Sequence, residues 1–349
     1  MIIFEKNLNK IKEIDNIHNK IICGETLDTL KKLPDKSVSL IITSPSYFLG
    51  KSYEKDYLFE DYITEHKKII IECKRVIKDN GAIFWNVAQT IIDKETFPLG
   101  VFFYNIFKDL DFHLKNWIIW KFEGGETPRT RLFGRYENVL WFIKNKQDYI
   151  FNLDHVRIPA KWITDKRCNN KGKNPEDFWV FDERINKDKL ISVKNKIEQY
   201  KKLLKTQAEN YVNQILMDET IREIEAKLDG LINSKEDIVK KNLSDNIWYI
   251  NRVVNISKKE KIKHPSTGEA HPCPFPEEMI KRIIKMSSNE NDVVLDIFNG
   301  SGTVCKVANE LNRKWIGIDK EIKYCEIAEH RISQRFSQKN KEVKECIDL

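Results

Sequence analysis

Two short segments of this chain carry side chains whose types and spacing could support chemistry. In the first, Asp296 ends an apolar run and precedes Gly300 and Gly302, and a second acid, Asp319, ends another apolar run about twenty residues later. Glycines in a turn let a ligand approach the backbone, and an acid that ends the second strand can bind ribose hydroxyls. This strand–turn–helix–strand layout predicts half of a nucleotide-cofactor site.

The second segment, 43–48, follows the apolar run 40–42 in the first part of the chain. It puts a polar-proline-aromatic turn at the end of a predicted strand, where open α/β sheets bind their ligands. A cofactor unit such as 296–319 usually opens its domain, so its position near the C-terminus predicts a circularly permuted order. The turn consists of Thr43, Ser44, Pro45, Ser46, Tyr47 and Phe48.

Together the two segments resemble the β class of amino-methylating DNA methyltransferases, in which the catalytic turn precedes the cofactor loop. The family's turn reads Ser, Asp or Asn, then Pro-Pro, then Tyr or Phe, and a leading serine is commonest among cytosine-N4 enzymes. Ser46 departs from this pattern because the family has proline there. Other segments resemble the family in the same order, at 24–38, 81–87, 117–121, 136–142 and 271–278.

The resemblance implies S-adenosylmethionine as the cofactor and double-stranded DNA, with the target base flipped out, as the partner. In the catalytic turn, which includes Ser46, Ser44 and the Pro45 carbonyl would accept the two amino hydrogens of the base, and Tyr47 would stack on it. The acids Asp296 and Asp319 would lie at the methionine moiety and at the ribose, and Glu25 and Phe298 would flank the adenine. The implied cofactor-binding residues are Glu25, His271, Phe275, Asp296, Phe298, Gly300, Gly302, Thr303 and Asp319.

The function implied by the resemblance is sequence-specific methylation of cytosine N4, as the modification component of a bacterial restriction system. Adenine N6 is the alternative target, since a leading serine only favours cytosine. A rival of another class is a DNA-binding relative with weak or lost catalysis, because serine at position 46 should loosen the turn or require a substitute hydrogen bond. A cognate restriction endonuclease is a further expected partner, and the oligomeric state stays open, with a dimer among the alternatives.

The elements that must position these residues follow from periodicity. Short apolar runs alternate with amphipathic stretches from 21 to 144, as βαβ units require. Residues 62–77 have helical spacing and are followed by a predicted turn at 79–81. With the resemblance, the expected fold is α/β: a class I S-adenosylmethionine-dependent methyltransferase, Rossmann-like, with a mostly parallel seven-stranded sheet, helices on both faces and a final antiparallel hairpin near 115–122 and 136–144.

The predicted domain organisation divides the chain into three parts. Residues 1–150 form the catalytic half, 151–265 a target-recognition region, and 266–349 the cofactor-binding half. A helical insertion at about 186–243 interrupts the middle part; it is either a solvated helix pair or a contact surface for DNA or a second subunit. Two similar segments, 174–179 and 243–248, flank this insertion, and both resemble a short Asp-x-Trp strand of cytosine-type members.

A basic loop separates the two strands of the predicted hairpin. It follows Gly124 and Gly125 and carries Arg129, Arg131 and Arg135. Arginines at a sheet edge favour contact with DNA phosphates or bases, and a solvated hairpin loop is the alternative.

Composition bounds the remaining possibilities. The chain has 349 residues, 41% of them hydrophobic and 32% charged, and a formal net charge of +7, which is compatible with an anionic partner. No apolar run approaches the roughly 18 residues needed to cross a bilayer, and the N-terminus lacks the apolar core of a signal peptide. The seven cysteines have no metal-binding spacing, so we expect no metal, and their scatter suits reduced thiols in a cytoplasm.

Overall fold

The structure is a computed structural model of the chain. It divides into two compact units, one built from Met1–Arg157, Glu176–Phe181 and Tyr249–Leu349, the other from Ile158–Pro175 and Asp182–Trp248. The predicted helical insertion at 186–243 lies outside the described residues, and the sheet with its helices belongs to the first unit. The described residues are 2–8, 14–49, 57–122, 129–132, 134–157, 171–172, 174–175, 177–179, 266 and 275–333.

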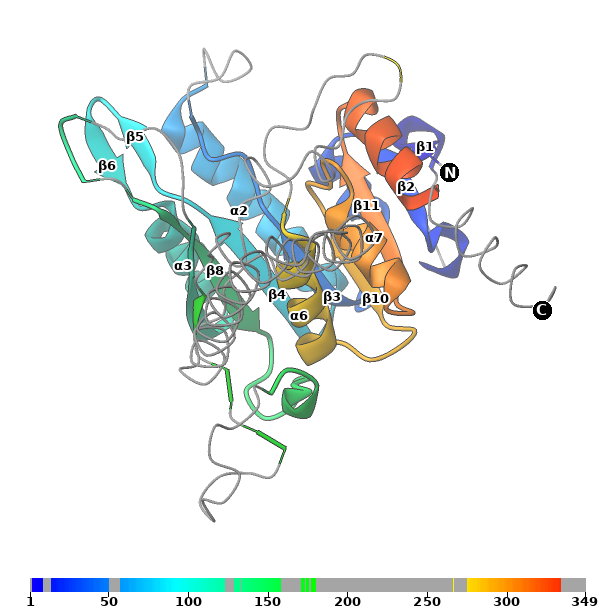
Figure 1. Ribbon diagram of the computed structural model, residues 1–349. Coiled ribbons are helices and arrows are strands. Elements are labelled where there is room, and N and C mark those ends of the chain that lie inside the picture. The colour runs from blue at the N-terminus through cyan, green and yellow to red at the C-terminus, as the bar shows by residue number, and fades with distance from the viewer. Residues whose placement is uncertain are drawn as a thin grey trace, which may run out of the picture. The chain divides into compact units, whose positions relative to one another are not determined.

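A single large sheet forms the centre of the first unit (Figure 1). Its strands are β1 (Ile2–Phe4), β2 (Lys20–Cys23), β3 (Val38–Thr43), β4 (Ile77–Val87), β7 (His113–Lys121), β8 (Tyr136–Ile143), β9 (Phe178–Trp179), β10 (Val293–Asp296) and β11 (Lys314–Asp319). They lie in the order β1-β2-β11-β10-β3-β4-β8-β7-β9. The seven expected strands, from β2 to β7 in this order, form the continuous centre, and β1 and β9 add a short strand at each edge.

Strand directions decide which chain segments meet. Neighbouring strands from β1 to β4 are all parallel, whereas β8 runs antiparallel to both β4 and β7. The predicted hairpin is therefore confirmed. The strands β2, β11, β10, β3 and β4 all end at one edge of the sheet, and β8 begins at that edge.

The permuted order predicted from the sequence is visible in the pairing. The late strands β10 and β11 are inserted between β2 and β3, with Leu295 opposite Ile41 and Ile318 opposite Ile22. The first of the two Asp-x-Trp segments supplies β9, which pairs in parallel with β7, and the Asp177 carbonyl accepts a hydrogen bond from the Ile119 amide at 2.8 Å. The second segment lies outside the described residues.

Helices cover both faces of the sheet. Residues of α1 (Thr26–Lys32), α2 (Phe59–Val76) and α3 (Leu99–Asp109) share one apolar cluster with alternate residues of the strands. On the other face, α6 (Glu277–Ser287) contacts β3 and β4, and α7 (Thr303–Glu310) contacts β10 and β11. Residues 322–333 form a further helix, and β5 (Thr90–Ile92) pairs with β6 (Glu95–Phe97) in a separate hairpin. Within the described ranges no helix has both the length and the apolarity to span a bilayer.

The predicted boundary after α2 was wrong in detail. Ile77 was expected to close the helix, but it is the first residue of β4 and pairs with Val38, whereas Leu40 already pairs with Ala82. The extra residues form a bulge where a turn was predicted. Gly81 allows it, since a Cβ there would lie 2.8 Å from the Ser39 carbonyl oxygen.

Candidate active site

The edge at which the parallel strands end gathers most of the predicted site residues. This arrangement follows from topology, because the carboxyl ends of adjacent parallel strands share one edge, and open α/β sheets bind ligands there. Each strand contributes a polar residue at or just after its end. These residues are Glu25 after β2, Asp319 on β11, Asp296 on β10, Ser44 after β3 and Asn86 on β4.

Asp319 organises the glycine turn through its carboxylate. Its Oδ2 accepts a hydrogen bond from the Gly300 amide at 2.7 Å, and its Oδ1 accepts one from the Glu321 amide at 2.9 Å. Burial raises the pKa of this carboxyl above its usual value. Each carboxylate oxygen can accept a second hydrogen bond, so Asp319 retains the capacity to bind two ligand hydroxyls.

The turn between β10 and α7 depends on glycine at two positions. Gly300 and Gly302 have φ values of 47° and 74°, which lie in the left-handed region that residues other than glycine rarely adopt. A Cβ on Gly302 would also lie 2.6 Å from the Cβ of Ala328. Thr303, which begins α7, is buried and accepts a hydrogen bond at 2.6 Å from Arg331. Glycine is therefore favoured at both positions by the backbone conformation, and at Gly302 also by the close packing of the turn against Ala328.

Asp296 connects the glycine turn with the second predicted segment. It is 2% exposed, and its Oδ1 accepts hydrogen bonds from Thr43 Oγ1 at 2.8 Å and from the Phe298 amide at 3.2 Å. Burial raises the pKa of this carboxyl to about 7, against the opposing effect of these two hydrogen bonds. Thr43 and Asp296 are far apart in the sequence, so this bond directly joins the two segments that the sequence singled out.

A cluster of four polar side chains lies at the end of β3. Ser44 Oγ donates to Tyr47 Oη at 2.8 Å, and Tyr47 Oη donates to Glu137 Oε2 at 2.7 Å. Asn86 Nδ2 donates to both Tyr47 Oη and Glu137 Oε2, at 2.7 and 2.8 Å. We call Ser44, Tyr47, Asn86 and Glu137 the polar quartet.

Ser46 stands where the resembling family has proline, and its neighbours restrain the turn in another way. The Ser46 carbonyl accepts a hydrogen bond from Tyr62 Oη at 2.6 Å, and the Phe48 carbonyl accepts one from Thr90 Oγ1 at 2.5 Å. Phe48 itself has a φ of 52°. The substitute hydrogen bonds that serine was expected to need are therefore made to the backbone on both sides of Tyr47, while Ser46 is exposed and Pro45 is buried.

The other predicted cofactor residues are less closely defined. Phe298 is partly buried, with its ring 5.8 Å from that of His66, whose pKa burial lowers to about 4. Glu25 is exposed at the start of α1, and Phe275 precedes the Pro276 cap of α6. His271 lies outside the described residues.

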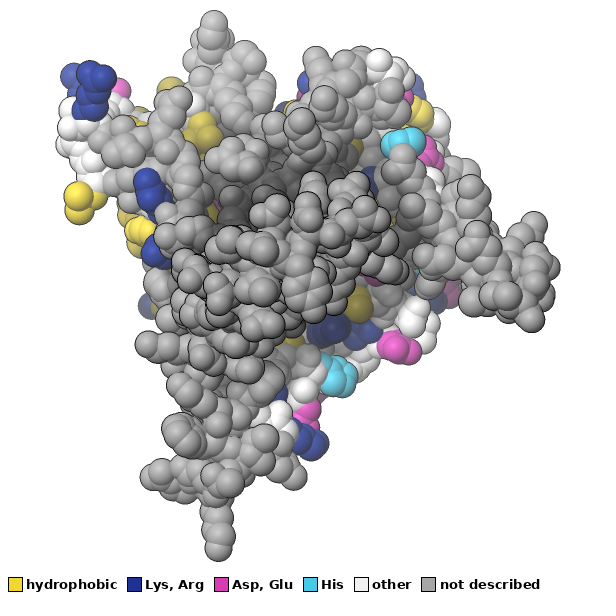
Figure 2. Space-filling view, viewed as in Figure 1, with side chains coloured by type: hydrophobic (Ala, Val, Ile, Leu, Met, Phe, Trp, Pro, Cys, Tyr) yellow, Lys and Arg dark blue, Asp and Glu magenta, His cyan; other side chains and the backbone are white. Residues whose placement is uncertain are grey.

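The predicted DNA-binding arginines lie between the end of β7 and the beginning of β8, at the same edge as the polar quartet. Arg129 and Arg131 are exposed and Arg135 is partly buried. Gly124 and Gly125 lie outside the described residues. On the face of the molecule seen in Figure 2, basic and acidic side chains of the described residues are interspersed.

Two buried residues of the quartet, Asn86 and Glu137, were missed as site residues. They are 2% and 4% exposed. Both occur in strongly apolar strand segments, and a polar side chain in such a segment must find partners when the strand is buried. That signal could have singled them out, although the sequence does not reveal that β8 carries Glu137 to the end of β3.

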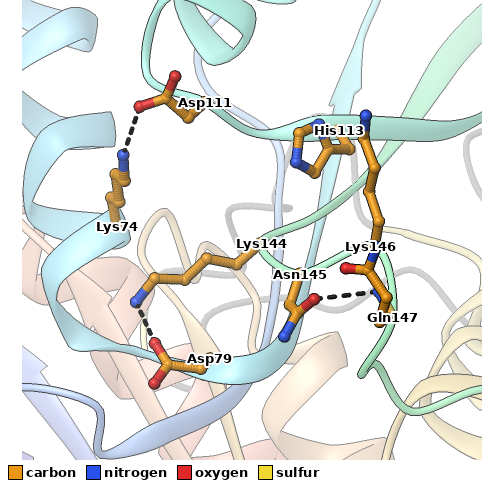
Figure 3. Close-up of a pocket in the computed structure, with 8 residues that line it drawn as sticks. All are labelled: Lys74, Asp79, Asp111, His113, Lys144, Asn145, Lys146 and Gln147. Carbon is orange, nitrogen blue, oxygen red and sulfur yellow. Dashed lines mark hydrogen bonds and ion pairs between the residues drawn. The ribbon is translucent and has the colours of Figure 1, made fainter.

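A cavity of about 450 Å³ opens at the opposite edge of the sheet (Figure 3). It is lined by Lys74, Asp79, Asp111, His113, Lys144, Asn145, Lys146 and Gln147. Lys74 forms an ion pair with Asp111 at 3.3 Å, which links the end of α2 to the segment before β7. Lys144 forms one with Asp79 at 3.0 Å, which links the residue after β8 to the first part of β4. None of the predicted site residues lines this cavity.

Comparison with known proteins finds relatives that match most of the chain. A family model for N6 and N4 methyltransferases, described as DNA methylase, matches residues 38–330. The type II methyltransferase M.BglII from Bacillus subtilis is 28% identical over 333 residues, which cover 92% of this chain and 71% of that protein. The DNA adenine methyltransferase YhdJ from Escherichia coli (strain K12) is 27% identical over 323 residues, which cover 89% of this chain and 82% of that protein.

Two solved structures share the fold. The PvuII DNA methyltransferase (cytosine-N4-specific) has a TM-score of 0.54 at 16% identity, over 89% of this chain and 85% of that one. A proposed DNA modification methylase from Thermus thermophilus, complexed with S-adenosyl-L-methionine, has a TM-score of 0.50 at 19% identity, over 90% of this chain and 93% of that one. At these identities the likeness shows a common fold.

Proposed function

The chain belongs to the N6/N4 family of DNA methylases, which use S-adenosylmethionine, and on that premise we propose that it methylates cytosine N4 at a specific site in duplex DNA. We propose further that it is the modification component of a type II restriction system with a cognate endonuclease, since relatives such as M.BglII are type II methyltransferases. The observation that carries the proposal is the hydrogen bond between Thr43 and Asp296, because it joins the Ser44 turn to the glycine turn.

The residues at the proposed cofactor site fit S-adenosylmethionine, the methyl donor. The second acceptor positions on the Asp319 oxygens suit ribose hydroxyls, and Gly300, which has no side chain, allows a ligand to approach the backbone of the turn. Asp296 supplies a carboxylate for the methionine amino group. When bound, S-adenosylmethionine supplies an activated methyl group on a sulfonium leaving group.

On the side of the target base, the protein must make a weakly nucleophilic amino nitrogen reactive. The lone pair of an exocyclic amino nitrogen is delocalised into the ring, so that nitrogen has to be held in a tetrahedral form. Ser44 Oγ and the Pro45 carbonyl accept its two hydrogens, so that the lone pair points to where the bound cofactor would present its methyl group. The cofactor would supply the methyl carbon and leave as a neutral thioether that keeps the C–S bonding pair, and the proton lost from nitrogen would pass to solvent through one of the two acceptors. Orientation of this kind can lower a barrier by roughly 7–11 kcal/mol in favourable cases. The base must leave the duplex to reach this position.

The choice of base rests on the serine-led turn, which favours cytosine N4. Adenine N6 is the second candidate, because YhdJ, a DNA adenine methyltransferase, is among the relatives. The hydrogen bonds from Tyr62 and Thr90 that restrain the turn without a second proline favour an active enzyme over a relative that only binds DNA.

Transfer of a labelled methyl group tests the proposal. We expect the wild-type protein to transfer the label from S-adenosylmethionine to duplex DNA of mixed sequence. Ser44→Ala should transfer it at least roughly a hundredfold more slowly, as in losses of a single transition-state hydrogen bond, whereas Ser333→Ala, an exposed control at another site, should match wild type. No transfer by the wild-type protein, or full activity of Ser44→Ala, would overturn the proposal.

A further inference from the structure

The polar quartet contains a carboxylate that the proposed reaction does not yet use. Glu137 comes from the second residue of β8, and Asn86 from the end of β4. Because both are almost fully buried, their polar atoms must be satisfied inside the protein or by a ligand. Within the described residues, Asn86 Oδ1 is buried and has no hydrogen-bond partner.

The directions of the hydrogen bonds in the quartet follow from the donors available. A carboxylate can only accept, so the single hydroxyl hydrogen of Tyr47 goes to Glu137. Tyr47 Oη must then act as the acceptor for Ser44, which places the single hydroxyl hydrogen of Ser44 toward Tyr47. The lone pairs of Ser44 Oγ therefore remain available to accept a hydrogen bond.

The same carboxylate fixes the amide of Asn86. Both Asn86 Nδ2 contacts go to atoms that accept, Tyr47 Oη and Glu137 Oε2. The reversed amide would put its oxygen against the carboxylate, so the quartet holds Asn86 with Oδ1 as the atom left over. In these hydrogen bonds, the side-chain hydrogens of Ser44, Tyr47 and Asn86 are all directed to other members of the quartet, and Ser44 Oγ and Asn86 Oδ1 can still accept.

We propose that Glu137 is a positioning residue that acts through the Tyr47 hydroxyl to keep Ser44 Oγ an acceptor. The inference rests on the proposed function. An exocyclic amino group offers hydrogen-bond donors, so a Ser44 hydroxyl whose hydrogen pointed toward the amino group would repel it. A Ser44 hydroxyl that donates its hydrogen to Tyr47 instead turns its lone pairs toward the amino group and accepts a hydrogen bond from it. Asn86 Oδ1 is a second acceptor held ready by the same carboxylate. A preoriented acceptor needs no reorganisation during the reaction, which is how such groups assist catalysis.

We call the path from Glu137 through the Tyr47 hydroxyl to Ser44 Oγ the relay, and the variants Glu137→Gln and Tyr47→Phe test its two steps separately. The glutamine amide can donate to Tyr47, which permits Tyr47 to donate to Ser44 and frees the serine hydrogen. Phenylalanine keeps the ring of residue 47, and hence any stacking on the base, but removes the hydroxyl. We expect each variant to lower the single-turnover rate of methyl transfer by roughly tenfold or more, with affinities for S-adenosylmethionine and DNA within about twofold of wild type.

The double variant Glu137→Gln/Tyr47→Phe decides whether the two residues act as one unit. If Glu137 works through Tyr47, the double variant should be no slower than the slower single variant. Losses that multiply, or wild-type rates in both single variants, would overturn the inference. Ser44→Ala in the same assay separates the two claims: if it is slow while both relay variants are fast, only the positioning role fails; if it is fast, the proposed function fails. Should Glu137→Gln not fold, Tyr47→Phe alone still decides, since a wild-type rate overturns the relay.

Discussion

At the scale of single residues, two carboxyl groups dominate the site: Asp296, which is buried, and Asp319, which is partly buried. Asp296 and Asp319 end adjacent parallel strands, and burial raises the pKa of both. Each carboxylate accepts two hydrogen bonds from the protein, and a ligand that donates further hydrogen bonds or carries positive charge would stabilise its ionised form. On the proposed roles of the two acids, we expect cofactor binding to be sensitive to their protonation and to their substitution.

Binding of S-adenosylmethionine should depend on pH through Asp296. Its pKa is about 7 because the group is buried, so the carboxyl is increasingly protonated below that pH and loses its attraction for a cationic amino group. Affinity should rise by up to tenfold per pH unit up to about pH 7 and then level off. Calorimetry between about pH 5.5 and 8.5 measures this dependence. The variant Asp296→Asn lacks this carboxyl, so any pH dependence that it retains comes from titration of the ligand. A pH dependence equal to that of the wild type would contradict the assignment.

Asp319→Ala should weaken cofactor binding. The substitution removes acceptors proposed for the ribose hydroxyls and also the partner of the Gly300 amide. Hydrogen bonds to charged groups are worth about 1.5–3 kcal/mol, which corresponds to roughly tenfold or more in affinity. Calorimetry on the folded variant measures the loss, with the exposed neighbour Glu321→Ala as control; equal affinity of Asp319→Ala and wild type would refute the ribose role.

At the scale of elements, the glycine turn between β10 and α7 is the most constrained feature. Gly302 combines a φ of 74° with a Cβ position only 2.6 Å from Ala328 Cβ. Arg331 ties the following residue, Thr303, to Glu277 on α6. The turn thus depends on the helix behind it, so changes there should affect stability as well as cofactor binding.

Gly302→Ala should destabilise the fold by about 1–3 kcal/mol, from backbone strain and from the close contact with Ala328. Gly134→Ala is a suitable control, because its Cβ would meet only the flexible end of Gln89. That control should change stability by less than about 0.5 kcal/mol. Urea unfolding measures both, and equal midpoints for the two variants would refute the argument for strain.

The sequence predicted elements better than it predicted contacts. Motif order and periodicity were sufficient for the fold class, the family and the permuted strand order, all of which are confirmed. The boundary at Ile77 was wrong because periodicity does not distinguish the last turn of a helix from the first residue of a buried strand. Glu137 was missed because its role depends on antiparallel pairing of β8 with β4, which no local pattern specifies.

At the scale of the whole molecule, the proposed function requires that duplex DNA, a polyanion, reach the edge of the sheet where the parallel strands end. The formal net charge of +7 is modest, and we propose that the loop carrying Arg129, Arg131 and Arg135 supplies part of the DNA contact. The middle part of the chain, predicted from the sequence as the target-recognition region, stays a prediction.

DNA affinity should fall with salt, and the three arginines should account for part of the slope. Each phosphate contact contributes about 0.9 to the slope of log affinity against log salt concentration. Replacing all three arginines by alanine should reduce that slope by up to about 2.7 while leaving cofactor affinity unchanged. Fluorescence anisotropy at several salt concentrations measures the slope. An unchanged slope would mean that the loop is solvated and does not contact DNA.

The central claim concerns one atom, the amino nitrogen that receives the methyl group. Duplex DNA of mixed sequence incubated with the protein and S-adenosylmethionine, digested completely and analysed by nucleoside mass spectrometry identifies that atom. The account predicts N4-methyldeoxycytidine, absent when Ser44→Ala replaces the wild type. N6-methyldeoxyadenosine as the sole product would contradict the choice of base, and a product methylated on ring carbon, or none, would contradict amino-group methylation altogether.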